Sequence, residues 1–291
     1  MTQTWLSYHF YPLETPDVFL TRALRPFLEQ YIWPTKGARA FFVRYDDERG
    51  PHIRLRLRGE AEWVEDTLRP AVEGLPAEAS EMEGLPAETS AKAGWFRERG
   101  ERIEVPYQPE PERFGGEEPL AWAEEHFHVS TRVVLDRLNQ ATYTYGDAMF
   151  DGLRTSAIAA YAAGFDRERT AWYFGQLCEQ WMPLFFRPEG GAAADAAFFA
   201  AIKEKFEASF ERQKDDLRDT LAGFWKTLET GKFDEKQPEW LRWLRGNELI
   251  LKGLDENLDR ALPSLLHLNY NRLGVTNQDE VFLCYLLSRA I

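Results

Sequence analysis

Arginines alternate with aliphatic residues between positions 52 and 58, where the sequence is His-Ile-Arg-Leu-Arg-Leu-Arg. Successive side chains of a β-strand point to opposite faces of its sheet. The aliphatic residues would therefore share a buried face, and His52, Arg54, Arg56 and Arg58 would share the other. Neighbouring positive charges repel one another, and they stand out in a chain whose formal net charge is −13. Arginine also binds carboxylate or phosphate bidentately. The row therefore predicts an anionic ligand; the alternative is an exposed face paired with nearby Asp and Glu.

A further arginine precedes this row in the segment Phe-Phe-Val-Arg-Tyr at positions 41–45. The turn-forming residues 46–50 separate the two segments, which is the pattern of a β-hairpin. If the two strands pair, we expect Arg44 to lie near Arg54 and Arg56 and to contribute to the same anion site.

Two later segments carry groups suited to acid–base chemistry and anion binding. The first, 107–116, ends in Arg113-Phe-Gly-Gly, and its glycines permit unusual backbone angles. The second, 264–273, places His267, Asn271 and Arg272 within two helical turns. An imidazole titrates near neutral pH and can move a proton. The structural alternatives are a core histidine, a turn-capping Arg113 and an Arg272 that interacts with the helix dipole.

Other kinds of site are not indicated by the sequence. It contains no phosphate-binding glycine loop, dinucleotide fingerprint or nucleophile elbow. His126 and His128 are two residues apart on an expected helix, so their rings point apart. We therefore expect neither a metal nor a cofactor.

The elements that must position these residues form an α+β pattern, with a sheet-containing N-terminal half and a largely helical C-terminal half. We expect strands at 5–10, 38–45 and 53–57, a helix at 61–69 ending before a proline, and a strand region at 95–105. Residues 73–90 contain a near-duplicate segment that we interpret as an exposed loop.

From residue 117 the pattern becomes helical. We interpret 1–291 as a single domain with an α/β half at 1–116 and a helical half at 117–291. The expected helices cover 118–138, 147–163, 167–181, 192–230, 238–258, 264–273 and a last segment capped by Thr276.

Composition limits the class of protein. With 291 residues, of which 44% are hydrophobic, the chain can bury a sizeable core. It shows no secretory signal and no apolar run of membrane-spanning length. Cys178 and Cys284 fall in apolar helical patterns, where buried free thiols are the norm. We expect a cytoplasmic protein, and the acidic balance argues against general binding to nucleic acid.

Taken in order, these motifs resemble the C-terminal domain of lantibiotic dehydratases, which also occurs as a free-standing protein in thiopeptide biosynthesis. The resemblance spans essentially the whole chain and rests on the segments 5–11, 42–45, 51–56, 107–116, 127–135 and 267–273. The chain departs from the family pattern at Asn269, where relatives often carry a second histidine.

The resemblance implies a lyase. In that family a separate tRNA-dependent enzyme esterifies Ser or Thr of a precursor peptide with glutamate. The domain then eliminates glutamate to leave dehydroalanine or dehydrobutyrine. By correspondence with the family's motifs, the catalytic residues would be Arg54, Arg56, Arg113 and His267. Substrate-binding residues would be Arg44, His52, Asn271 and Arg272. We expect no direct contact with nucleic acid or membrane, and a homodimer is left open.

Two alternatives stay open at this point. Members of the same superfamily catalyse a formal [4+2] cycloaddition that builds the pyridine core of thiopeptides. The chain could instead be a non-catalytic subunit that binds an extended precursor by strand addition at a sheet edge. Elimination is preferred because arginines and a histidine suit an anionic leaving group and proton transfer.

Overall fold

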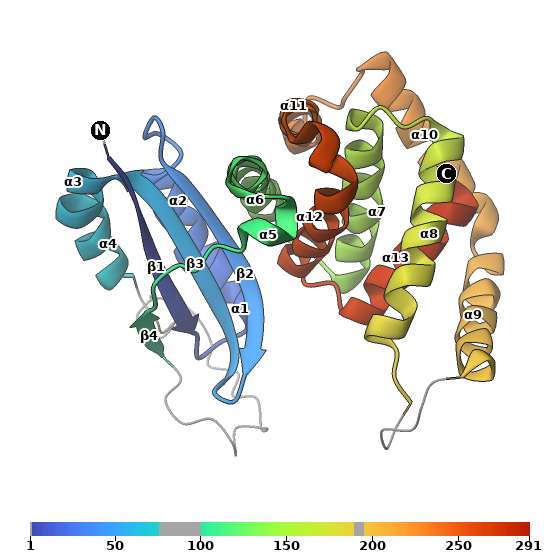
Figure 1. The fold of residues 1–291 in the computed structure, drawn as a ribbon, viewed down its shortest axis with the longest axis horizontal. Helices are drawn as coiled ribbons and strands as arrows, with labels where there is room; N and C mark the ends of the chain where they lie inside the picture. Colours follow the sequence, from blue (N-terminus) through green and yellow to red (C-terminus); the bar gives the residue numbers. More distant parts are fainter. Residues whose placement is uncertain (1, 76–99, 189–194) are drawn as a thin grey trace. The chain divides into compact units, whose positions relative to one another are not determined.

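The computed structural model describes residues 2–75, 100–188 and 195–291 (Figure 1). The chain divides into two compact units, and each is described by itself. Unit 1 comprises Met1–Glu112 and Gly116–Ala141, and unit 2 comprises Arg113–Gly115 and Thr142–Ile291. A sheet in the N-terminal half and helices in the rest confirm the predicted α+β class.

Unit 1 is built on a four-stranded antiparallel sheet with the order β2-β3-β1-β4. Its strands are β1 (Gln3–Tyr11), β2 (Arg39–Asp47), β3 (Gly50–Glu60) and β4 (Glu101–Glu104). The predicted hairpin is confirmed as β2–β3, with Asp47 paired with Gly50 at its turn. Parts of two predictions, the strand region at 95–99 and the duplicated loop at 76–90, lie outside the described residues.

One face of the sheet forms the core of unit 1. Ile53, Leu55 and Leu57 of β3 are fully buried, as predicted from the alternation. The ring of Phe10 on β1 lies 5.0 Å from that of Phe19 on the first helix. The helices of unit 1 are α1 (Pro16–Phe19), α2 (Arg25–Tyr31), α3 (Ala61–Trp63), α4 (Arg69–Glu73) and α6 (Glu117–Leu138), with the short α5 (Pro111–Phe114) at its boundary.

Two π-helical stretches, Leu20–Leu24 and Val64–Leu68, join these short helices into continuous ones. Each is followed two residues later by a proline, Pro26 or Pro70. Proline lacks the amide hydrogen and clashes with the carbonyl four residues earlier in a regular helix. A local π-turn changes the hydrogen-bond spacing at that point. The prediction that the second helix ends before Pro70 is therefore wrong, because the helix widens and continues to Glu73.

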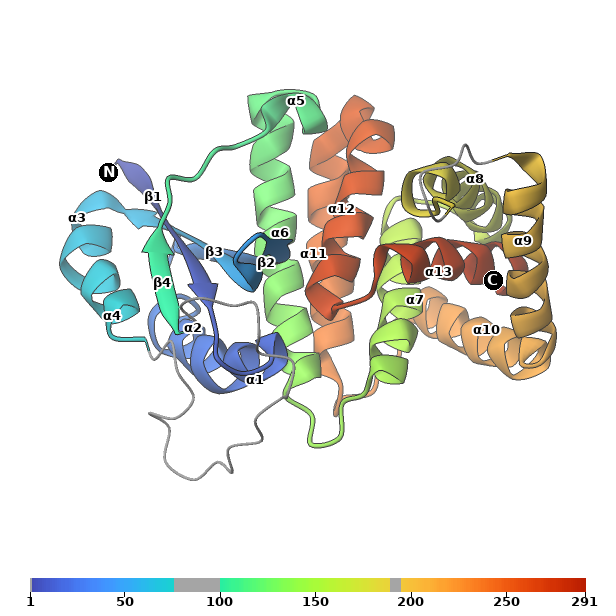
Figure 2. The same ribbon diagram turned by 90° about the horizontal axis from the view of Figure 1, so that it is seen from below.

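Helix α6 belongs to unit 1, although the predicted division at residue 116 placed it in the helical half. It lies alongside β2 (Figures 1 and 2). Nδ1 of His128 lies 3.1 Å from the amide nitrogen and 3.2 Å from the carbonyl oxygen of Ala40, so the ring bonds one or the other according to its tautomer. The amide of Phe42 donates to Oγ1 of Thr131. Side chains of α6 thus bind the backbone at the outer edge of β2.

Unit 2 is helical, and α13 lies at its centre with α7, α8, α9, α10 and α12 packed around it (Figure 2). The bounds are α7 (Tyr145–Ala162), α8 (Arg167–Phe185), α9 (Ala196–Glu211), α10 (Lys214–Thr230), α11 (Pro238–Leu254), α12 (Leu258–Leu273) and α13 (Asn277–Ala290), with a 3-10 turn at Asp255–Asn257.

The prediction of one helix over 192–230 is wrong, because the chain turns at Arg212 and Gln213 between α9 and α10. The turn lets both helices pack against α13 and bury their apolar stripes. Residues 192–194 lie outside the described residues. Cys178 and Cys284 are buried free thiols, as expected.

The described helices include none that is both long enough and apolar enough to span a bilayer. Within the same residues, no group of three or more His, Cys, Asp or Glu side chains is arranged to hold a metal ion.

Candidate functional site

The polar face of the sheet gathers the predicted arginines. The register pairs His9 with Arg54, Ser7 with Arg56 and Trp5 with Arg58. Residues paired across antiparallel strands point to the same side. Arg54, Arg56 and Arg58 therefore share a face with alternate residues of β1, opposite the buried aliphatic face. This confirms the placement that the alternation predicted.

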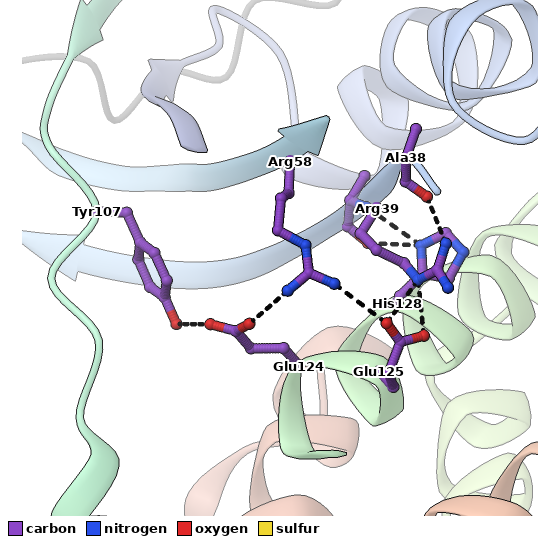
Figure 3. A network of polar contacts seen from close by, with 8 residues as sticks. Ala38, Arg39, Arg58, Tyr107, Glu124, Glu125 and His128 are labelled. Atoms are coloured by element: carbon purple, nitrogen blue, oxygen red, sulfur yellow. Dashed lines mark hydrogen bonds and ion pairs between the residues drawn. The ribbon is translucent and has the colours of Figure 1, made fainter. Parts of the chain in front are cut away.

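Arg58 is held in a local network with acidic residues of α6 (Figure 3). Its Nη1 and Nη2 atoms donate to Glu124 at 3.0 Å and to Glu125 at 3.2 Å. Arg39 binds Glu125 from the next strand, at 2.6 Å, and the hydroxyl of Tyr107 donates to Glu124. Burial raises the pKa of Glu124 despite the nearby guanidinium. The charge of Arg58 is thus balanced within the protein, which is the structural alternative stated above.

Arg54 and Arg56 differ from Arg58, because no carboxylate among the described residues forms an ion pair with either of them. The guanidinium of Arg54 lies over the ring of Tyr45, 3.3 Å from its centroid. That of Arg56 donates to the carbonyl of Leu55. Burial, with the charge of Arg54, lowers the pKa of Arg56 to about 10. Both side chains are half-buried, so part of each stays exposed to solvent.

Two histidines lie beside these arginines. His52, predicted as a substrate-binding residue, is only 1% exposed and accepts a hydrogen bond at Nε2 from Nε of Arg54. His9 was not among the predicted site residues; its Nε2 lies 3.4 Å from Nη2 of Arg56. The pairing of β1 with β3 brings it there, and this long-range register was not predicted from the sequence. Burial, together with Arg56 and Arg54, lowers the pKa of His9 to about 4.

Arg44 does not join the row, so this prediction is wrong. The register pairs Arg44 with Ile53, which places it on the face opposite Arg54 and Arg56. Its Nη2 donates to Oδ1 of Asp17 at 2.5 Å. The hairpin was predicted correctly, but the face that a side chain occupies depends on which residues pair across the two strands, and this register was not predicted.

His267 of α12 lies in unit 2 against a buried acid. Its Nδ1 is 2.8 Å from Oε2 of Glu280 on α13, and its ring stacks on Phe185 at 5.9 Å. Burial raises the pKa of Glu280 to about 7, against the opposing effect of His267. Thr276 caps α13 and fixes the start of the helix that carries Glu280. The sequence analysis missed Glu280, because it meets His267 only when two helices pack.

Arg113 is also placed in unit 2, where its Nε donates to Oγ of Ser264 at 2.9 Å. Ser264 precedes His267 by three residues on α12, so the two are neighbours on the helix surface. Gly115 has φ +109°, and a Cβ there would meet Oδ1 of Asn257 at 2.1 Å. The positive φ favours glycine at this position, and any larger residue would also displace the side chain of Asn257 just before α12.

The remaining predicted residues of α12 differ in exposure. Arg272 is 0% exposed, with its Nη1 donating to the carbonyl of Leu268, and burial lowers its pKa to about 9. A substrate would reach it only if the helical core opened. Asn271 is half-buried, and its carbonyl accepts from the amide of Gly274. Asn269 is buried and donates to Thr155, so it serves the core.

Comparisons with solved structures give the fold context. The pyridine synthase TbtD from thiomuracin biosynthesis aligns over 98% of this chain and 97% of its own, with 16% identity and a TM-score of 0.74. TsrL aligns over 99% and 94%, with 19% identity and a TM-score of 0.64. The tRNA-dependent lantibiotic dehydratase MibB from Microbispora sp. 107891 aligns over 99% of this chain but 28% of its own, with 20% identity and a TM-score of 0.64.

These identities show a shared fold. A search of curated proteins finds no match. The family model for the C-terminal part of lantibiotic biosynthesis dehydratases matches residues 5–291. That match covers nearly the whole chain, including the arginine row, the Arg113 segment and α12. The chain therefore belongs to the lantibiotic biosynthesis dehydratase C-terminal family.

Proposed function

We propose that this protein is a lyase that eliminates glutamate from glutamylated Ser or Thr of a ribosomally made precursor peptide. The observation that carries the proposal is the pair Arg54–Arg56, two adjacent guanidinium groups with no carboxylate partner among the described residues. The protein is strongly acidic and supplies carboxylates to Arg58 on the same strand. Arg54 and Arg56 lack such carboxylate partners among the described residues, and this favours an anionic ligand at these two side chains.

The chemistry accounts for these charges. A base removes the Cα proton of the esterified residue, and the electron pair forms the Cα=Cβ double bond. The Cβ–O bond breaks, and glutamate leaves as a carboxylate. Positive charge that is already oriented stabilises both the developing enolate and the leaving carboxylate. We assign these roles to Arg54 and Arg56.

We assign proton transfer to His267, oriented by Glu280 through its Nδ1. Arg113 is proposed as a further anion-binding group; it is exposed and lies one helical turn from His267 through Ser264. The glutamyl ester would be supplied by a separate tRNA-dependent enzyme, so this chain would contact the precursor peptide and not tRNA.

The test is mass spectrometry of a Ser/Thr-glutamylated precursor incubated with the purified protein alone. We expect each site to lose glutamate and to finish one water below the unmodified peptide. The variant H267N keeps a polar side chain but loses the imidazole, and it should leave the glutamylated peptide in place. An unchanged adduct with folded wild-type protein and a cognate peptide would overturn the proposal.

A second candidate function is the [4+2] cycloaddition between two dehydroalanines. It is favoured by the match to a pyridine synthase over nearly the full length of both chains. The distinguishing substrate is a peptide that already carries dehydroalanines. Ring formation with release of the leader would support the cycloaddition, whereas inertness towards it together with glutamate loss from the first peptide would support elimination.

A further inference from the structure

A cluster of aromatic rings lies beside the arginine pair. The ring of His52 stacks with that of Tyr11, with centroids 4.6 Å apart, and with that of His9, with centroids 5.1 Å apart. The ring of Tyr45 lies 5.4 Å from it at a tilt. This enclosure buries His52 and fixes both imidazole planes. The rings come from three adjacent strands, so their arrangement depends on the sheet register and not on a loop.

Each histidine presents one ring nitrogen to one arginine. Nδ1 of His52 lies 3.1 Å from the carbonyl of Gly50, to which it donates, so Nε2 is left as the acceptor for Nε of Arg54 at 3.2 Å. Nε2 of His9 faces Nη2 of Arg56 at 3.4 Å. The Nε contact leaves both terminal nitrogens of Arg54 without a hydrogen-bond partner among the described residues, which is the geometry that bidentate binding requires.

A neutral acceptor has a different electrostatic effect from a carboxylate. Glu124 and Glu125 orient Arg58 and also cancel its charge. An imidazole acceptor orients a guanidinium and leaves its full positive charge for a ligand. We propose that His9 and His52 are positioning residues that hold Arg56 and Arg54 oriented but uncompensated, for a ligand carrying carboxylate groups. This deepens the proposed function and rests on it.

The surroundings favour the neutral form of both rings. Burial lowers the pKa of His52, and burial with Arg56 and Arg54 lowers that of His9. The other charged groups that act on them are Asp47 and Asp46 at the end of β2, which favour the protonated forms. On the other side of β1, His9 is paired with Ile103 of β4, which is apolar and adds no charge. A protonated Nε2 could no longer accept from an arginine and would repel it.

The test is a double-mutant cycle on glutamate release from the glutamylated peptide. His9→Phe keeps a stacking ring but removes the acceptor, and we expect it to lower kcat/KM about tenfold, which corresponds to about 1.4 kcal/mol. In an Arg56→Lys background the same change should have little further effect. His9→Phe combined with Arg54→Lys joins residues from different pairs, so the two losses in kcat/KM should be closer to additive. The corresponding test of the other pair combines His52→Phe with Arg54→Lys.

Two controls keep the test decisive. His9→Asn offers an amide oxygen as acceptor and should recover part of the activity, and urea unfolding separates loss of fold from loss of positioning. Full additivity of His9→Phe with Arg56→Lys would overturn the inference. So would wild-type activity in both phenylalanine variants.

A second readout does not depend on turnover. Long-range proton–nitrogen NMR of the wild-type protein at pH 7.5 should show unprotonated Nε2 in both His9 and His52. An imidazolium or a protonated Nε2 in either ring would overturn the inference for that ring.

If wild-type protein releases no glutamate, the proposed function fails, and titration with free glutamate then tests the positioning. Wild-type protein should bind it more tightly than the His9→Phe variant, and equal affinity would overturn the inference.

Discussion

Three arginines on β3 have similar positions in the sequence but different surroundings. Arg58 is neutralised by Glu124 and Glu125, whereas Arg54 and Arg56 are oriented by neutral groups. The alternation predicted that all three share a face. It could not distinguish them, because the carboxylates come from α6, more than sixty residues away in the chain. The three arginines therefore fall into two groups: Arg54 and Arg56, which we propose bind an anion, and Arg58, which is paired within the protein.

This difference predicts opposite results for one substitution. Arg56→Lys removes the planar fork that grips a carboxylate and should lower kcat for glutamate release by about 10²-fold, in the range for loss of one charge-stabilising donor. Arg58→Lys, made on the same strand as a matched control, keeps its ion pair and should retain most activity. Single-turnover assays on the glutamylated peptide measure both, and similar losses in the two variants would contradict the division.

Glu280 predicts a pH-dependent stability. Its pKa in the folded protein, about 7, lies above the ordinary value of 4.5. The folded state therefore holds a proton that the unfolded state releases, so this stabilisation is present below pH 4.5 and lost as the pH rises to 7. The stability of wild type relative to Glu280→Gln should fall by about 2 kcal/mol between pH 5 and 7.5.

Urea unfolding at the two pH values measures this difference. The matched control is Glu256→Gln, at an exposed acid in the turn before α12. This variant also removes one carboxylate, but from a solvent-exposed position, so it corrects for the general effect of a lost negative charge. A difference for Glu280→Gln that is constant between pH 5 and 7.5 would contradict the prediction.

At the scale of elements, α6 closes the outer edge of the sheet at Ala40 and Phe42. A peptide adding as a strand at these positions would have to displace His128 and Thr131. An exposed edge strand is also a template for aggregation, and covering it removes that hazard. The non-catalytic alternative, in which the precursor extends the sheet, therefore finds this part of the β2 edge already bonded.

Thr131→Val tests this edge contact. The substitution keeps the shape of the side chain but leaves the buried amide of Phe42 without its acceptor, and it should cost about 1–3 kcal/mol of unfolding free energy. Thr131→Ser keeps the hydroxyl and should cost less. Hydrogen exchange at the Phe42 amide should accelerate only in the valine variant, and unchanged exchange there would show that the bond contributes nothing.

Element types were more predictable than element partners. The β2–β3 hairpin and most helices follow local patterns of period two or 3.6. The periodicity of α6 predicts a helix but not its packing partner, and the contacts group this helix with the sheet of unit 1. The prediction of one helix over 192–230 was wrong for a related reason. The apolar pattern continues on both sides of the turn at Arg212–Gln213, so it does not reveal the break. The contact between His267 and Glu280 likewise depends on how α12 meets α13.

At the scale of the whole molecule, we expect the buried histidines of unit 1 and the buried acid Glu280 of unit 2 to respond to acid in opposite directions. Unit 1 contains His9 and His128, whose pKa values fall to about 4, and His52, whose pKa is also lowered. The unfolded chain protonates these rings near their ordinary value of 6.5, so the three rings should lower the stability of unit 1 as the pH falls from 6.5 towards 4. The raised pKa of Glu124 in the same unit opposes this effect. Unit 2 contains Glu280, whose contribution grows as the pH falls through the same range.

Hydrogen exchange followed by mass spectrometry of the intact protein tests this contrast. After correction for the intrinsic pH dependence of exchange, a change from pH 7 to pH 5 should reduce protection in β1, β3 and α6. The loss should correspond to about 1–3 kcal/mol once partial solvent exposure of the rings is allowed for. Protection in α12 and α13 should hold or increase. A uniform change across both units would contradict the assignment.

The alternation on β3 has a consequence for folding fidelity. A slip of one residue in its pairing with β1 or β2 would turn Arg54, Arg56 and Arg58 into the core and expose the aliphatic side chains. Burying unpaired guanidinium groups costs far more than a misaligned hairpin can recover. The same charges that we propose for anion binding therefore also disfavour this one-residue slip, so replacing all three with neutral residues should yield a protein prone to register errors.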